Sequence, residues 1–308
     1  MLPKEPARRP QLGFLYLPPF RVQGLSIAGE ESVVHVPELD LAFDIGLCPK
    51  AVLPAAFVAL THGHMDHVAG LGYYLSQRPF QGMGPGTVLC PPELEGPLHG
   101  LMEAWSKVER QRVPYELIAL GHGETHPIKN NHLLRAFKTD HTVPSVGYTV
   151  LERRTRLKAE YQGLEQPELV KLKKSGQEIV DTFLIPLVTY TGDTAYGEHL
   201  LSDEVLRSKI LITECTFTEA SHKRRANVGK HLHLDDIVKL LDRGENEAVV
   251  LTHLSRRSNM PQVRRALDRT IPPEHRDRVF VLMDGRTNRE RYERQVAEAG
   301  GGDGPERA

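Results

Sequence analysis

The stretch Thr61-His62-Gly63-His64-Met65-Asp66-His67 decides the fold of this chain. It follows the apolar run 57–60 (Phe-Val-Ala-Leu), which we interpret as a buried strand, so the cluster occupies the loop after that strand. A short loop held by a rigid strand can fix several ligands around a metal. Imidazole and carboxylate groups suit Zn²⁺, and Mn²⁺ or Fe²⁺ also accept them. The stretch therefore predicts a metal site, because this spacing behind a strand is rare in an ordinary histidine-rich surface loop.

Three further polar residues follow predicted strands elsewhere in the chain. His141 comes after the strand-like segment 136–140, Asp193 follows the apolar run 187–189, and His253 follows 249–252. Each residue on its own is better explained as an exposed or capping residue. Four segments that all deliver donors at strand ends predict one centre that holds two metals.

Size and composition limit the classes of protein that this chain can form. Its 308 residues with 40% hydrophobic content suffice for one large domain, which we place at 1–299, with a disordered tail at 300–308. No run reaches the ~20 apolar residues of a membrane span, and no secretory signal is visible. Three widely spaced cysteines do not indicate a disulfide framework. We therefore expect a cytoplasmic protein that does not contact a membrane.

The hydrophobic pattern alternates between short strands and helices. Strands are expected at 41–45, 57–60, 133–137, 145–151, 187–191, 210–213, 248–252 and 279–283. Helices are expected at 67–77, 93–109, 234–242 and 262–270. Strands followed by helices indicate an α/β sandwich in which two packed sheets carry helices on their outer faces.

The 61–67 motif resembles the signature of the metallo-β-lactamase fold superfamily, whose members are mostly hydrolytic metalloenzymes. The resemblance implies a four-layer αββα sandwich and a ligand set shared between two metals. In that pattern His62, His64 and His141 bind one metal, Asp66, His67 and His253 bind the second, and Asp193 bridges them. Asp44, in Ala42-Phe43-Asp44-Ile45-Gly46, matches a buried aspartate that often orients a ligand imidazole, although an aspartate in a structural turn is an equal alternative.

The sequences around these ligands are similar to one branch of the superfamily, RNase Z, a zinc phosphodiesterase that trims tRNA 3′ ends. The similarity runs in order over roughly residues 20–285. Its segments are 137–148 (Phe-Lys-Thr-Asp-His-Thr-Val-Pro-Ser-Val-Gly-Tyr), 191–194 (Thr-Gly-Asp-Thr), 211–217 (Leu-Ile-Thr-Glu-Cys-Thr-Phe), His231, and 252–257 (Thr-His-Leu-Ser-Arg-Arg).

The RNase Z resemblance implies two Zn²⁺ ions, with Mn²⁺ or Fe²⁺ as alternatives, and a hydroxide between them that attacks an RNA phosphodiester. Asp66, His231 and Glu214 are the expected catalytic residues. His231, oriented by Glu214, would protonate the leaving oxygen, with His233 as the alternative acid. Ser145, Ser255 and Arg256 are expected to contact substrate. The implied partner is RNA, including precursor tRNA, and relatives of this branch are often homodimers.

Other functions remain open from the sequence. The same centre could hydrolyse a small or cyclic phosphodiester, or serve a thioesterase or lactonase, which needs no acid because its leaving group departs easily. A catalytically silent binding protein is a further alternative, but it would be expected to lose metal ligands.

Two basic segments are candidates for RNA contact, because the net charge of −1 gives no overall attraction to a polyanion. One is 222–225 (His-Lys-Arg-Arg) with Lys230. The other is the segment 152–174, which includes a short lysine-rich helix at 169–174 and lies within a charged insertion at 152–186. This insertion takes the place of the RNase Z arm without that arm's length or Gly-Pro motif. We expect it to lie over the site as a lid or a short RNA clamp.

Overall fold

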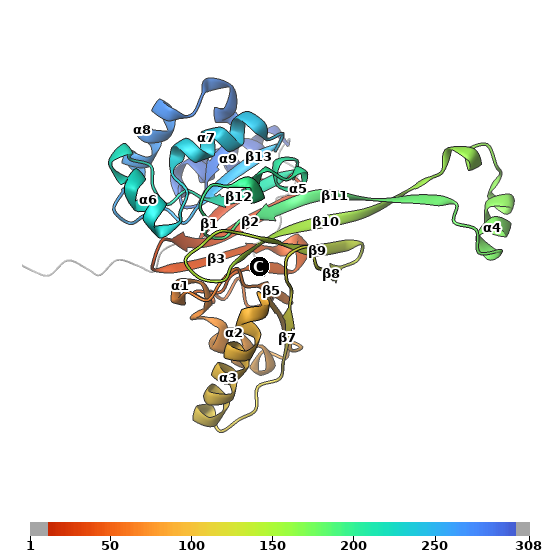
Figure 1. Ribbon diagram of the computed structural model, residues 1–308, viewed down its shortest axis with the longest axis horizontal. Coiled ribbons are helices and arrows are strands. Elements are labelled where there is room, and N and C mark those ends of the chain that lie inside the picture. Colours follow the sequence, from red (N-terminus) through yellow and green to blue (C-terminus); the bar gives the residue numbers. More distant parts are fainter. Residues whose placement is uncertain (1–11, 300–308) are drawn as a thin grey trace, which may run out of the picture.

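The computed structural model describes residues 12–299, so the predicted tail at 300–308 lies outside the described part. Two seven-stranded mixed sheets pack face to face, and helices cover both outer surfaces (Figure 1). The expected four-layer αββα sandwich is confirmed. None of the helices within residues 12–299 combines the length and apolar character that a membrane span requires.

The first sheet begins with antiparallel hairpins and continues with parallel strands, in the order β1-β2-β3-β4-β5-β6-β7. The helices α2 (Leu71–Phe80) and α3 (Pro92–Glu109) cover its outer face. The short helix α1 (Met65–Val68) follows the histidine loop. The strands of the first sheet are β1 (Gly13–Leu17), β2 (Phe20–Ile27), β3 (Glu31–Val36), β4 (Leu41–Phe43), β5 (Phe57–Ala59), β6 (Gly86–Cys90) and β7 (Tyr115–Ala119).

The second sheet has the order β14-β13-β12-β11-β10-β9-β8 and carries α7 (Leu234–Arg243) and α8 (Met260–Thr270) on its outer face. Shorter helices α5 (Asp203–Leu206) and α6 (Lys223–Gly229) follow β11 and β12, and α9 (Gly285–Glu298) packs beside β1. The strands of the second sheet are β8 (Thr125–Lys129), β9 (His132–Lys138), β10 (Val146–Leu157), β11 (Val180–Tyr190), β12 (Ile210–Glu214), β13 (Ala248–Thr252) and β14 (Val279–Val281).

Alternation along the strands builds the central core. Val34, Phe43 and Ala59 of the first sheet face Tyr148 and Val250 of the second, and all five are fully buried. The outer face of each sheet packs against its helices. On α7, the buried residues Leu234, Ile237, Leu240 and Leu241 recur with the helical period and cover β12 and β13.

Strand direction decides where the site forms. Strand β9 is antiparallel to β10, which is antiparallel to β11, and β11 is parallel to β12 and β13. Strands β9, β11, β12 and β13 therefore end at the same edge of this sheet, as does β14, which is parallel to β13. In the first sheet, β4 and β5 also run parallel. The loops after these strands carry the predicted metal-binding side chains to one place.

The insertion at 152–186 does not lie over the site, so that expectation was wrong. Strands β10 and β11 continue past the body as a paired ribbon from Glu152↔Ile185 to Leu157↔Val180. The tip carries α4 (Gln166–Lys174), which buries no residue. We call residues 152–185 the arm. It projects from the body on the side opposite α1 and α6 (Figure 1). The β10 half of the ribbon, residues 152–157, is charged or polar at every position but the last, so the hydrophobic pattern did not mark it as a strand.

Candidate metal centre

Three imidazoles from two loops form the first half of the centre. The loop after β5 supplies His62 and His64, and the loop after β9 supplies His141. The His62 Nε2 atom lies 3.1 Å from His64 Nδ1, and His141 Nε2 lies 3.3 Å from that same atom. Three imidazole nitrogen atoms that converge in this way form a triangular set of metal donors.

The second half combines Asp66 and His67 of α1 with His253, which follows β13. The His253 Nε2 and His67 Nε2 atoms lie 3.4 and 3.6 Å from Asp66 Oδ2. Asp193 Oδ2 lies 3.4 Å from His67 Nε2, 3.3 Å from His253 Nε2 and 3.9 Å from His62 Nε2. Asp193 thus adjoins both halves, and all seven predicted ligands come together in one cluster.

The cluster fits a pair of metal ions. Asp193 Oδ1 and His67 Nε2 are buried and lack any hydrogen-bond partner within residues 12–299, a costly state that a bound cation would relieve. Burial, together with the neighbouring His67, lowers the pKa of His62 to about 2. This imidazole is therefore neutral and can offer a lone pair. The His and Asp clusters are consistent with a dinuclear metal site.

Asp44 anchors the second half from below. This buried carboxylate accepts a hydrogen bond from His67 Nδ1 at 2.8 Å and from the Tyr190 hydroxyl at 3.0 Å. Its other oxygen accepts from the Thr61 backbone N–H at 2.7 Å and the Thr61 hydroxyl at 2.9 Å. The contact expected between Asp44 and a ligand imidazole is present. The sequence analysis missed Thr61 and Tyr190, because both read as ordinary strand-end or core residues.

Close backbone approach also shapes the site. Gly192, just before Asp193, has φ +58°, and an added Cβ would lie 2.7 Å from the Thr61 side chain. Only glycine fits that backbone conformation beside that neighbour without strain. The loops after β5 and β11 can therefore approach each other closely enough for Asp193 to reach the histidines.

The predicted pair of His231 and Glu214 is formed beside the cluster. Glu214 Oε1 accepts from His231 Nδ1 at 3.0 Å and from the Thr194 N–H at 2.8 Å. Burial alone would lower the pKa of His231, but the adjacent Glu214 carboxylate raises it to about 9. Asp193 Oδ2 lies 3.9 Å from His231 Nδ1. His231 can thus hold a proton at the edge of the metal cluster.

A threonine that the sequence analysis missed connects this pair to a ligand. The Thr216 hydroxyl lies 2.9 Å from His253 Nδ1 and donates to Glu214 Oε2. With Nε2 facing the metal site, His253 carries its hydrogen on Nδ1 and donates it to Thr216. The Thr216 hydroxyl in turn donates a hydrogen bond to Glu214. The signal was present in the sequence as Glu214-Cys215-Thr216, on the same strand end as the glutamate.

His233 is a structural residue rather than the alternative acid. Its Nδ1 accepts from the Asp235 N–H at 3.1 Å and caps α7, while its Nε2 lies 3.1 Å from the Glu219 carbonyl.

Lys230 also has a role that was not expected. Its carbonyl accepts from His141 Nδ1 at 3.2 Å, and its ammonium pairs with Asp140 at 2.7 Å.

The three residues expected to contact substrate lie in different settings. Ser145, on the loop after β9, accepts a hydrogen bond from the Thr139 hydroxyl at 2.7 Å. The buried Ser255 accepts from the Arg257 N–H at 3.3 Å and holds the turn after β13. Arg256 is exposed and pairs with Glu30. No direct contact joins these three side chains, and their contact with substrate stays a prediction.

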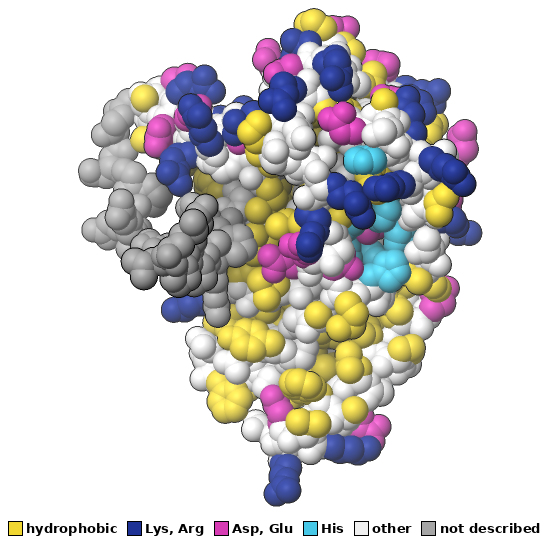
Figure 2. All heavy atoms as spheres, turned by 90° about the vertical axis from the view of Figure 1, so that its left-hand side faces the viewer, with side chains coloured by type: hydrophobic (Ala, Val, Ile, Leu, Met, Phe, Trp, Pro, Cys, Tyr) yellow, Lys and Arg dark blue, Asp and Glu magenta, His cyan; other side chains and the backbone are white. Residues whose placement is uncertain are grey.

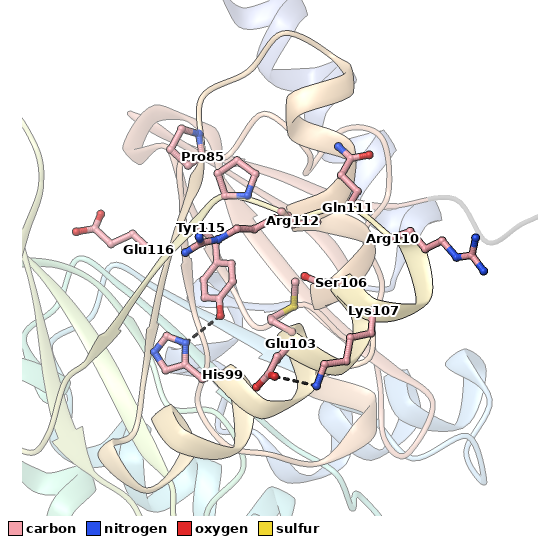
Figure 3. A pocket seen from close by; sticks show the side chains of 13 residues that line it. Pro85, His99, Glu103, Ser106, Lys107, Arg110, Gln111, Arg112, Tyr115 and Glu116 are labelled. Atoms are coloured by element: carbon pink, nitrogen blue, oxygen red, sulfur yellow. Dashed lines mark hydrogen bonds and ion pairs between the residues drawn. The ribbon is translucent and has the colours of Figure 1, made fainter.

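The histidines are visible from outside, with Lys and Arg side chains beside them and an apolar surface below (Figure 2). A groove of about 560 Å³ adjoins His141 and is lined also by His122 and Lys138. A larger groove of about 940 Å³ lies between the end of α3 and β7 (Figure 3). It contains none of the seven clustered ligands.

Comparison with known proteins agrees with this geometry. Residues 46–254 match the family described as Beta-lactamase superfamily domain. The chain is 35% identical over 270 residues to tRNase Z TRZ1 of Arabidopsis thaliana, covering 86% of this chain and 96% of that protein. The chain belongs to the tRNase Z family of this superfamily. It is also 35% identical over 252 residues to the chloroplastic tRNase Z TRZ2 of the same plant, covering 80% and 71% of the two chains. The RNase Z resemblance is thereby confirmed.

Solved structures confirm the fold of this tRNase Z family member. The short form of human tRNase Z superimposes with a TM-score of 0.54 at 14% identity, covering 88% of this chain and 95% of that one. Zinc-bound PqqB from Methylobacterium extorquens gives a TM-score of 0.56 at 15% identity, covering 89% and 98%.

The metal assignment predicts that the purified protein holds about two transition-metal ions per chain. Asp193→Ala should lower that content and abolish hydrolysis, because it removes the carboxylate that adjoins both halves. Elemental analysis and activity should be measured together. Asp203→Ala, which removes an exposed carboxylate on α5, is the control. Full metal content and full activity in Asp193→Ala would show that the assignment is wrong.

The Thr216 contacts predict that its hydroxyl supports both the metal and the His231–Glu214 pair. Thr216→Val keeps the shape but leaves His253 Nδ1 and Glu214 Oε2 without partners. We expect a loss of about 10- to 100-fold in metal affinity or activity, as is usual when a ligand's hydrogen-bond partner is removed. Thr216→Ser, which keeps the hydroxyl, should retain both. Competition with a chelator measures the affinity, and equal behaviour of the two variants would contradict the prediction.

Proposed function

We propose that this protein is a dinuclear-metal endoribonuclease that cleaves an RNA phosphodiester, with precursor tRNA as its substrate. The contact between His231 and Glu214 beside a full set of seven ligands carries the proposal. Thioester and lactone hydrolysis need no such acid, because their leaving groups depart without a proton. A phosphodiester that releases a sugar oxygen does need one. The names of the relatives, tRNase Z and ribonuclease Z, support RNA as the substrate.

The residues divide the chemistry between them. His62, His64 and His141 would hold one ion, Asp66, His67 and His253 the other, and Asp193 both. When bound, the two ions would activate water and neutralise the phosphoryl oxygens. The imidazole and carboxylate donors suit Zn²⁺. Glu214 accepts the Nδ1 hydrogen of His231 and thereby leaves the Nε2 hydrogen facing the leaving oxygen. Thr194 and Thr216 hold Glu214 in place through its two oxygens.

The acid role of His231 predicts a dependence on the leaving group. His231→Ala should keep its metal content and lose roughly 100-fold or more on RNA, whose leaving alkoxide needs a proton. The loss should be much smaller on bis(p-nitrophenyl) phosphate, since p-nitrophenolate leaves unaided. Rates on both substrates and metal content decide the matter. Equal losses on both substrates would indicate a structural role for His231, and wild-type protein inactive on RNA would favour a small-phosphodiester substrate.

We also propose that the protein acts as a homodimer in which the arm grips RNA bound to the partner. The eleven residue steps from Val146 to Leu157 extend roughly 36 Å from the His141 loop, so the arm leads away from its own centre. Exposed apolar side chains on α1, α2 and α3 offer a surface for a second copy. They are Met65, Tyr73, Leu101, Trp105 and Val108, between 42% and 73% exposed.

Mixing two defective variants tests the arm in the dimer. One variant replaces residues 156–181 with a short turn, and the other carries Asp193→Ala. Each alone should cleave little RNA, while the arm deletion should still hydrolyse bis(p-nitrophenyl) phosphate. If the arm serves the partner's centre, subunit exchange between the two variants should restore RNA cleavage. Unchanged cleavage of precursor tRNA by the arm deletion alone would remove any role of the arm in substrate binding.

A further inference from the structure

The helix α6 stands beside His231 through several direct contacts. The His231 N–H donates to the Ala226 carbonyl at 2.9 Å, and Ala226 is the buried residue of this helix. At the start of α6, the His222 ring lies 5.6 Å from the Phe217 ring, which lies 6.2 Å from the His231 ring. These contacts place α6 next to the loop that carries His231. In Figure 2, Lys and Arg side chains gather immediately beside the exposed histidines.

Two arginines of α6 differ from the other cations of this segment. Lys223 pairs with Asp235, and Lys230 pairs with Asp140 at 2.7 Å. Arg224 and Arg225 are exposed and have no carboxylate partner within 4 Å among residues 12–299. Two uncompensated guanidinium groups beside a centre for phosphodiester hydrolysis are suited to bind further phosphates.

The chemistry determines which phosphates these are. A water oxygen bonds to phosphorus, the P–O3′ bond breaks, and O3′ takes the proton from His231 Nε2, while the proton lost by the water returns to His231 through solvent. O3′ belongs to the nucleotide on the 5′ side of the broken bond. Because a proton donor must lie within hydrogen-bond reach of that oxygen, the 5′ nucleotide lies against His231. Because α6 adjoins His231, it lies on the same side of the centre as that nucleotide.

We propose that Arg224 and Arg225 bind backbone phosphates on the 5′ side of the scissile bond and so set the polarity of RNA across the centre. The inference rests on the proposed endoribonuclease function. Phosphate contacts of this kind fix position and direction without reading sequence. They give binding that weakens steeply with salt.

The test compares Arg224→Gln/Arg225→Gln with Arg110→Gln/Arg112→Gln, a control that removes the same charge elsewhere. Arg110 and Arg112 follow the 18-residue helix α3, whose far end lies about 27 Å from its start near His141. The probe is a precursor tRNA with a 3′ trailer, assayed as kcat/KM at several potassium chloride concentrations. The α6 variant should reduce the slope of log kcat/KM against log salt by about 1.5, and the control should not change it.

Neutral methylphosphonate linkages then locate the contacts. Placed within three phosphates on the 5′ side, they should reduce cleavage by the wild type but not reduce further that of the α6 variant. On the 3′ side they should affect both proteins equally. An unchanged salt slope in the α6 variant, or a loss of sensitivity confined to the 3′ side, would overturn the proposal while RNA cleavage by the wild type stands. Absence of RNA cleavage in the wild type would instead refute the proposed function.

Discussion

An imidazole that offers one nitrogen to a metal carries its hydrogen on the other nitrogen, which almost always donates to a carboxylate, a carbonyl or a water. The geometry of this molecule follows from that constraint. His67 donates directly to the Asp44 carboxylate. His62 Nδ1 donates to the Thr61 hydroxyl at 3.0 Å, which in turn donates to Asp44. One buried carboxylate of the first sheet therefore orients a ligand in each half of the centre.

The second sheet has the same arrangement of a ligand histidine, a threonine and a buried carboxylate. His253 donates to Thr216, and Thr216 donates to Glu214, just as His62 reaches Asp44 through Thr61. Glu214 differs in what else it holds, because its other oxygen binds His231, which is not among the seven ligands. Glu214 accepts three hydrogen bonds inside the protein, from Thr194, Thr216 and His231. The same support that orients a metal ligand thus orients the candidate acid, which explains why the acid stands at a fixed place beside the metals.

The sequence predicted the ligands better than the structure that supports them, for physical reasons. Histidines and aspartates that follow apolar runs indicate the end of a strand. Parallel strands end at one edge of a sheet, so these residues can be predicted to lie together. Thr61 and Tyr190 carry no such signal, and the signal for Thr216 is only its place two residues after Glu214, since β-branched and aromatic residues are ordinary in strands. Their roles depend on which strands are neighbours in the sheets, and local hydrophobic periodicity does not predict that pairing. His233 shows the converse, because a histidine in a promising motif caps a helix instead.

The arm shows most clearly what the hydrophobic pattern can and cannot reveal. The first six residues of β10 are buried between the layers and were predicted as a strand, whereas Arg153, Arg154 and Arg156 continue the same strand in solvent. Beyond the body, pairing between β10 and β11 maintains the ribbon, and the exposed part of β10 has no hydrophobic face to mark it as a strand. A two-stranded ribbon has little stability of its own in water, so the buried portion of both strands must anchor it. Its direction is then fixed by the sandwich, and it points away from the metal centre of its own chain. A charged tip held so far from that centre has a use in catalysis only if another molecule, a long RNA or a second subunit, spans the distance.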